Sequence, residues 1–188
     1  MDELAALRQF FGFSAFRAGQ QTLIDAVLSG RDALGVMPTG GGKSLCYELP
    51  ALLLPGLTLV VSPLISLMKD QVMALRNAGI PAGCINSAMS MDELREAYTD
   101  ARYGAYKLLY VAPERLLTDG FCALAQELEI PLVAVDEAHC ISQWGQDFRP
   151  SYLKIVDFLQ QLPRRPAVAA FTATATAQVR ADIVRILQ

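Results

Sequence analysis

The stretch Gly35-Val36-Met37-Pro38-Thr39-Gly40-Gly41-Gly42-Lys43-Ser44 decides the fold of this chain. The apolar residues 33–36 indicate a short buried strand, and the apolar residues 45–54 indicate a helix. A glycine loop between a strand and a helix can point successive backbone N–H groups at one anion, and the helix N-terminus adds its positive dipole. The segment therefore predicts a phosphate-binding P-loop.

The end of this loop carries the residue types that hold a nucleotide and its cation. Lys43 can reach the β- and γ-phosphates, and the Ser44 hydroxyl can ligate Mg²⁺. The common pattern G-x-x-x-x-G-K-[ST] has glycine where this chain has Met37. A glycine turn that only happens to precede Lys-Ser is the alternative, and the rest of the chain weighs against it. The expected nucleotide-binding residues of the loop are Met37, Pro38, Thr39, Gly40, Gly41, Gly42, Lys43 and Ser44.

The composition is that of one globular domain. The 188 residues are 53% hydrophobic, and no apolar run is long enough to span a bilayer. No secretory signal follows Met1, so we expect a cytoplasmic protein, in the cytosol or nucleoid if it is bacterial. The four cysteines form no C-x-x-C pair, which argues against a zinc site and a disulfide framework. The net charge of -3 means that any DNA site must be local and small, or completed by another part of the protein.

Short apolar runs alternate with helical patterns along the whole chain. Strands are expected at 33–36, 57–61, 82–85, 108–111, 132–135 and 167–171, and helices at 4–11, 19–28, 45–54, 62–75, 91–102, 151–162 and 176–187, with a helical turn from Pro113. This alternation predicts an α/β fold with a mainly parallel sheet covered by helices on both faces. Polar loops follow five of the strands, and ligands bind at the carboxyl edge of such sheets.

A second candidate motif is Val133-Ala134-Val135-Asp136-Glu137-Ala138-His139, an apolar strand that ends on two carboxylates. Asp136 can hold Mg²⁺ directly or through water, and Glu137 can orient and deprotonate an attacking water. Two acids after a strand often form only a solvated turn, but a P-loop in the same chain favours catalysis. His139 is the only histidine. A lone histidine is usually structural, but its place beside the carboxylates favours a coupling role.

Six segments of the chain stand out together: 16–20 (FRAGQ), 37–47 (MPTGGGKSLCY), 62–71 (SPLISLMKDQ), 112–116 (APERL), 136–145 (DEAHCISQWG) and 171–175 (FTATA). Taken together, they resemble the first RecA-like motor domain of the RecQ family of DNA helicases, in helicase superfamily 2. The resemblance covers residues 13–175 and tolerates Met37, with small departures at Ala18 and Glu48, where we expect the family to have Pro and Gln.

The resemblance implies hydrolysis of Mg-ATP, with Lys43, Glu137 and His139 as catalytic residues and Ser44 and Asp136 as metal ligands. It also implies an adenine site, for which the chain offers three side chains. An amide such as that of Gln20 can pair with N6 and N7 of adenine, with Arg17 nearby and Phe13 able to stack on the ring. Without the resemblance, Gln20 would be an ordinary residue at the start of a helix.

Trp144, Phe148 and Arg149 lie just past the carboxylates. Exposed aromatic rings beside arginine form a stacking platform for unpaired bases, although both rings could equally be core residues. The resemblance implies an aromatic-rich loop here that couples DNA binding to ATP hydrolysis. Lys69 and Arg115 are candidate phosphate contacts, or else ordinary surface charge.

Thr172 and Thr174 follow the strand expected at 167–171. The resemblance implies that this strand lies between the P-loop strand and the carboxylate strand, so its loop could sense the γ-phosphate. Alternatively, the two hydroxyls cap the next helix.

The resemblance also defines what the rest of such a motor contains. A helicase of this kind needs a second RecA-like domain, whose arginine finger is worth about 10³–10⁵ in rate. That domain and the zinc-binding and winged-helix regions are not among these residues. Residues 1–188 are thus predicted to be the first motor domain of an ATP-dependent 3′-to-5′ DNA helicase, weakly active or inactive alone, with single-stranded or partly duplex DNA as its partner. A nucleotide- or DNA-binding module without turnover of its own is the alternative.

Overall fold

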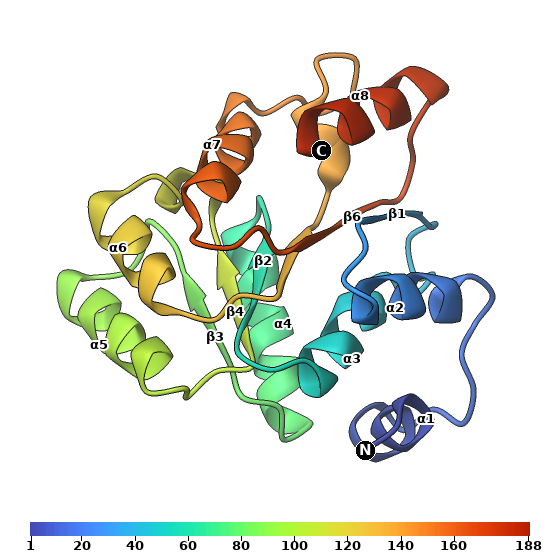
Figure 1. Ribbon diagram of the computed structural model, residues 1–188, viewed down its shortest axis with the longest axis horizontal. Coiled ribbons are helices and arrows are strands. Elements are labelled where there is room, and N and C mark those ends of the chain that lie inside the picture. Colours follow the sequence, from blue (N-terminus) through green and yellow to red (C-terminus); the bar gives the residue numbers. More distant parts are fainter.

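The computed structural model describes residues 1–188 and has a six-stranded sheet at its centre (Figure 1). Every strand pair is parallel, and the strands lie in the order β1-β6-β5-β2-β4-β3. The strands are β1 (Ala33–Val36), β2 (Thr58–Val61), β3 (Ala82–Ile85), β4 (Leu108–Val111), β5 (Leu132–Val135) and β6 (Ala167–Thr172). The predicted α/β fold with a parallel sheet is confirmed.

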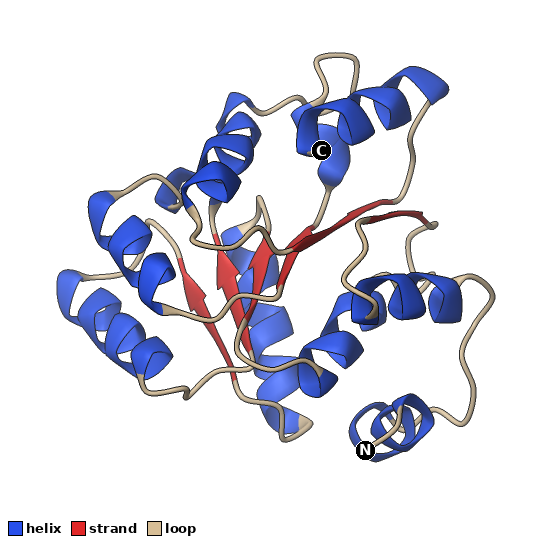
Figure 2. Ribbon diagram, viewed as in Figure 1, coloured by secondary structure: helices blue, strands red, loops and turns tan.

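Helices cover both faces of this sheet (Figure 2). They are α1 (Glu3–Ala6), α2 (Gln20–Leu28), α3 (Leu45–Leu53), α4 (Ile65–Asn77), α5 (Met91–Arg102), α6 (Asp119–Glu127), α7 (Lys154–Gln161) and α8 (Ala177–Leu187). Shorter helical turns are formed by Leu7–Phe11, Pro113–Arg115, Ala138–Ile141 and Pro150–Leu153. None of the helices combines the length and the apolar content needed to cross a membrane.

Each central strand divides its side chains between two hydrophobic layers. Leu59 and Val61 of β2 pack in the layer with α5, α6, α7 and α8, whereas Val60 packs in the layer with α2, α3 and α4. Because both faces are covered, the strands are apolar throughout, which explains the unbroken apolar runs in the sequence. Burial of these runs on both sides holds the strand ends in place, and the loops that leave those ends carry the motifs.

The structure corrects several expected elements. Val36, the last residue of strand β1, is 39% exposed rather than buried. The helix expected from residue 62 begins at Ile65 because Leu64 is still extended. Helix α6 was not predicted at all, since Thr118-Asp119-Gly120 reads as a loop, although Phe121 and Leu124 pack its buried face. The helix expected at 91–102 is confirmed, and Ser90 caps its N-terminus in a complete capping box with Glu93.

Candidate nucleotide-binding site

The glycine loop joins the edge strand β1 to α3. The Met37 N–H donates to the Thr172 carbonyl at 3.0 Å and so continues the β1–β6 ladder by one residue. The Met37 side chain packs at the border of the core. The left-handed backbone needed for the turn falls later, at Gly40 (φ 77) and Gly42 (φ 80). Position 37 therefore has no need of glycine in this chain.

Two donors of the glycine loop form hydrogen bonds to carbonyl groups of the loop itself. Lys43 Nζ donates to the Met37 carbonyl at 3.4 Å, and the Gly41 N–H donates to the Pro38 carbonyl at 2.8 Å. Ser44 immediately precedes α3, and its hydroxyl makes no capping bond to that helix. Lys43 and Ser44 thus both stand at the N-terminus of α3, where a phosphate and its cation would bind.

Gln20 and Arg17 contact the same loop from the preceding segment. The buried Gln20 amide accepts from the Arg17 N–H at 2.8 Å and donates to the Gly42 carbonyl at 3.1 Å. The Arg17 guanidinium donates to the Gly40 carbonyl at 2.6 Å. A Cβ on Gly42 would lie 2.3 Å from Gln20 Nε2, so glycine is required for this contact. The adenine role expected for Gln20 stays a prediction. These two hydrogen bonds fix the orientation of the Gln20 amide in the structure.

A cavity of about 520 Å³ brings the glycine loop, the segment before α2 and the two acids together. Phe13 lies at its rim with half of its surface exposed, as stacking on a base would require. The cavity is lined by Phe11, Phe13, Ala15, Arg17, Gln20, Thr39, Gly40, Gly42, Lys43, Ser44, Leu45, Tyr47, Glu48, Leu67, Gln71, Asp136 and Glu137.

Asp136 directly follows β5 and is buried in the wall of this cavity. Burial and the neighbouring Glu137 carboxylate raise the pKa of Asp136 to about 6, against the opposing effects of the Glu137 N–H and Lys43. A buried carboxyl beside a second acid is stabilised in its charged form by a cation. Together with the free Ser44 hydroxyl, this oxygen donor set fits Mg²⁺.

Glu137 is the only residue other than glycine with a positive φ, at 50°. This left-handed backbone costs about 1 kcal/mol or more for a residue with a Cβ, and such strain gathers at functional sites. The turn carries the carboxylate to His139, with Glu137 Oε2 lying 3.4 Å from His139 Nδ1.

His139 links Glu137 to the loop after β6. Its Nδ1 lies 2.9 Å from Thr172 Oγ1, and that hydroxyl donates to the Thr174 carbonyl at 3.0 Å. The Thr172 hydroxyl donates its one proton to the Thr174 carbonyl, so it can only accept a hydrogen bond from His139. The ring proton of His139 is therefore on Nδ1. Neither Thr172 nor Thr174 caps the next helix, since Thr176 does so by accepting from the Val179 N–H. The register confirms that β6 lies between β1 and β5.

Two residues of this site escaped the sequence reasoning. The Tyr152 hydroxyl donates to the Asp136 carbonyl at 2.8 Å and fixes the backbone at the end of β5. Glu48 is a buried carboxyl in the cavity wall, and burial raises its pKa to about 7 despite a bond from Tyr110 at 3.4 Å. The only signal for Glu48 was its departure from the expected Gln. Tyr152 had no sequence signal.

The loop after His139 exposes its tryptophan. Trp144 is 72% exposed, so the alternative of a core tryptophan is wrong, while Phe148 is half-buried. Arg149 pairs with Asp147 at 2.9 Å and also donates to the Pro63 carbonyl at 3.5 Å. The loop is therefore attached at its far end to the segment after β2.

The near end of the same loop is anchored to α8. The Ser142 hydroxyl donates to Asp182 at 2.7 Å and accepts from the Trp144 N–H at 3.1 Å. Gly145 lies so close to the His139 carbonyl that an added Cβ would be 2.4 Å away. The ring of Trp144 thus projects from a base that is held firmly against the segment 138–141.

Lys69 and Arg115 lie apart from this loop. Lys69 is exposed on α4 and lines a cavity shared with Glu93 of α5, and Arg115 is half-buried in the turn after β4. The Arg115 Nε is buried without a hydrogen-bond partner. Both stay predicted phosphate contacts.

A parallel sheet with a glycine loop after β1 and paired carboxylates after β5 defines a P-loop nucleotide-binding domain. The profile of the DEAD/DEAH box helicase family matches residues 17–183, and the chain belongs to that family. It is 52% identical over 182 residues to an ATP-dependent DNA helicase RecQ of Bacillus subtilis, covering 96% of this chain and 31% of the relative. A RecQ of Haemophilus influenzae is 48% identical over 184 residues, covering 98% and 30%. The chain spans about a third of the length of these relatives.

Solved helicase structures share the fold. A hypothetical ATP-dependent RNA helicase from Sulfolobus tokodaii superposes with a TM-score of 0.75 at 23% identity, covering 100% of this chain and 55% of that one. The DUF1998 helicase MrfA bound to DNA and AMPPNP superposes with a TM-score of 0.78 at 17% identity, covering 100% and 28%. The RecA-like fold is confirmed.

Proposed function

We propose that this chain is the ATP-binding motor domain of an ATP-dependent DNA helicase. The observation that carries the proposal is the link from Glu137 through His139 to Thr172, directly beneath a loop with an exposed tryptophan. Such a link gives base stacking at Trp144 a short path to the residue that would activate water. The names of the RecQ relatives support DNA as the substrate, and the resemblance supports 3′-to-5′ movement.

The residues of the cavity divide the chemistry among themselves. Ser44 and Asp136 would hold Mg²⁺, which when bound neutralises charge on the β- and γ-phosphates. Lys43 exchanges its bond to the Met37 carbonyl for the phosphates. Glu137 accepts the proton of the attacking water, and His139 keeps that carboxylate oriented.

Adenine is the base that the site would select. The Arg17 N–H holds Gln20 Oε1, and ATP binding would exchange the Gln20–Gly42 bond for a bond to the ring. We expect ATP to bind better than GTP, and Gln20→Ala to remove the preference. Competition between the two nucleotides for a fluorescent ATP analogue measures this, and equal affinities in the unmodified protein would contradict the adenine role.

Turnover needs more than these residues. Since the chain spans about a third of its RecQ relatives, a second RecA-like domain of the same protein is the proposed partner. This chain alone should bind Mg-ATP and hydrolyse it weakly or not at all, because the arginine finger is worth about 10³–10⁵ in rate.

A DNA-stimulated ATPase assay on this chain and on a chain extended by the second domain tests the proposal. Nucleotide binding by both, with DNA stimulation only in the longer one, is the expected result. Lys43→Ala serves as the control that loses the grip on the phosphates. Nucleotide binding without DNA stimulation in the longer chain would instead favour a binding module.

A further inference from the structure

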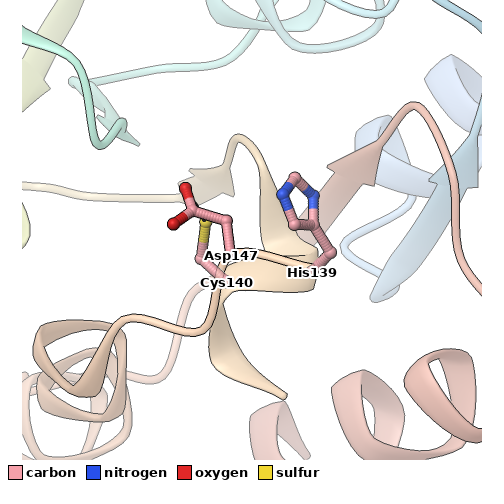
Figure 3. Close-up of side chains that lie close together, drawn as sticks. All are labelled: His139, Cys140 and Asp147. Atoms are coloured by element: carbon pink, nitrogen blue, oxygen red, sulfur yellow. Dashed lines mark hydrogen bonds between the residues drawn. The ribbon is translucent and has the colours of Figure 1, made fainter. Parts of the chain in front are cut away.

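The base of the Trp144 loop holds a group of three side chains, of which only His139 takes part in the proposed nucleotide chemistry. The ring of His139, the thiol of Cys140 and the carboxylate of Asp147 gather there, with one possible ligand atom from each within 4.8 Å of the others (Figure 3). Cys140 is fully buried and Asp147 is exposed, so the group reaches from the core to the surface. Imidazole, thiolate and carboxylate are the donors of zinc sites that keep one position open.

An independent observation outside the group concerns the orientation of the histidine. Thr172 accepts the Nδ1 proton of His139, so Nε2 keeps the lone pair that a metal requires. Metal-binding histidines nearly always have their second ring nitrogen fixed in this way by a hydrogen-bond acceptor. The proton arrangement of a ligand is thus set before any ion arrives.

We propose that His139, Cys140 and Asp147 form a binding site for a soft divalent cation, with Zn²⁺ as the best match. The ion would join the segment 138–141 to the loop that carries Trp144. Mg²⁺ would not compete, because it prefers oxygen donors. The proposal departs from the sequence expectation of no zinc in this chain, which rested on the absence of a C-x-x-C pair, because a site of one cysteine, one histidine and one aspartate needs no such pair.

A tetrahedral site requires the three side chains to close around the ion, because their ligand atoms lie up to 4.8 Å apart. Donor atoms around tetrahedral zinc lie about 3.3 to 3.8 Å apart, given its bond lengths. The Cys140 Sγ lies 4.0 Å from Asp147 Oδ2, so the exposed Asp147 must move slightly. A neighbouring cavity of about 300 Å³ is lined by His139, Trp144 and Gln146, and the exposed Asp147 opens the group to solvent.

Two opposing terms limit the affinity. Both Arg149 contacts fall on Asp147 Oδ2, so the ion must compete with a guanidinium for this carboxylate. Burial and Asp147 raise the pKa of Cys140 to about 12, so the free thiol is protonated. Binding therefore exchanges an S–H bond for an S–Zn bond and releases one proton to the buffer.

Titration of this chain with Zn²⁺ and with Co²⁺ tests the site. We expect one ion per chain, a thiolate-to-cobalt charge-transfer band, and one proton released in calorimetry compared between two buffers. Cys140→Ser and Asp147→Asn should each weaken binding by about tenfold or more. Cys122→Ser is the matched control, since Cys122 lies on α6 and should be silent.

Histidine NMR gives a second readout, because His139 is the only histidine. Its ring should carry the proton on Nδ1 without metal, and Zn²⁺ should shift the Nε2 signal. No cobalt–thiolate band, or equal affinity in Asp147→Asn, would overturn the site. If Cys140→Ser does not fold, Asp147→Asn still tests the site, because Asp147 is exposed and its substitution should leave the fold intact.

A consequence for activity rests on the proposed function. An ion that ties His139 to Asp147 would hold the Trp144 loop and draw Asp147 from Arg149, so Zn²⁺ should reduce DNA stimulation of ATP hydrolysis in the longer protein. Asp147→Asn should be less sensitive to the ion. If Zn²⁺ binds but stimulation is unchanged, the site stands and its link to the motor fails.

Discussion

Glu137 has a strained backbone at the point where catalysis is proposed. Its φ of 50° suits glycine or asparagine better than glutamate. Glu137→Gln keeps the shape and loses the base, so Mg-ATP binding should persist while turnover in the longer protein falls by about 10²-fold or more. Wild-type turnover in this variant would refute the catalytic assignment.

The same position offers a stability test. Glu137→Asn should raise the free energy of unfolding by about 0.5–1 kcal/mol, because asparagine tolerates the left-handed region. Urea denaturation of this chain measures the change, with Glu137→Gln as the control that keeps the strain. A stabilised but inactive Asn variant would show that the strain serves the site.

Glu48 makes the stability of the domain depend on pH. Its pKa is about 7 in the folded chain, against 4.5 for an ordinary glutamate. The folded state therefore binds more protons than the unfolded state between these values, and stability falls as pH rises from about 4.5 to about 7. Glu48→Gln has no carboxyl group to ionise, so it removes this loss of stability at higher pH. Its amide oxygen still accepts from the Tyr110 hydroxyl.

We expect Glu48→Gln to be more stable than the wild type at pH 8 by about 1–3 kcal/mol, and to gain little near pH 4.5. Urea midpoints at the two pH values measure the difference. Asp136 also has a raised pKa, but this residue is present in both proteins, so its effect on their difference in stability largely cancels. An equal gain at both pH values would mean that the effect comes from packing rather than from charge.

The Trp144 loop is the element through which DNA would act. Both ends of the loop are fixed by hydrogen bonds, from Ser142 to Asp182 and from Arg149 to the Pro63 carbonyl. A base stacked on Trp144 would therefore act on a loop whose two ends are anchored. Stacking is worth about 1–3 kcal/mol per base, enough to bias a two-state loop.

Trp144→Ala in the longer protein should therefore abolish most of the DNA stimulation of ATP hydrolysis and leave ATP binding intact. Since the ring is exposed, the variant should fold normally, and circular dichroism checks this. Stimulation at the wild-type level would exclude the loop as the coupling element.

At the scale of the whole molecule, the charge sets the strength of DNA binding. The net charge is -3, and only Lys69, Arg115 and Arg149 are proposed for DNA contact. On single-stranded DNA, each phosphate contact contributes about -0.7 to the slope of log affinity against log salt concentration. The three cations therefore predict a slope of about -2. Fluorescence anisotropy with a labelled oligonucleotide measures it. Arg149→Ala should reduce the slope by about 0.7, whereas Trp144→Ala should weaken binding at an unchanged slope.

The sequence by itself determined the local features of this protein. Apolar runs and breaks placed all six strands within a residue or two, because strands buried on both faces carry their own signal. The glycine loop and the paired acids were equally local, since each motif is one continuous segment. The sequence failed for α6, whose short amphipathic pattern begins in residues typical of a turn.

Only the tertiary structure decided which distant side chains meet. Placing β6 between β1 and β5 brings Thr172 to His139, and packing α8 under the loop brings Asp182 to Ser142. The contact of Tyr110 with Glu48 and the approach of Asp147 to Cys140 also depend on the folded chain. These contacts depend on strand order and on the paths of loops, and neither is encoded in the spacing of residues along one segment.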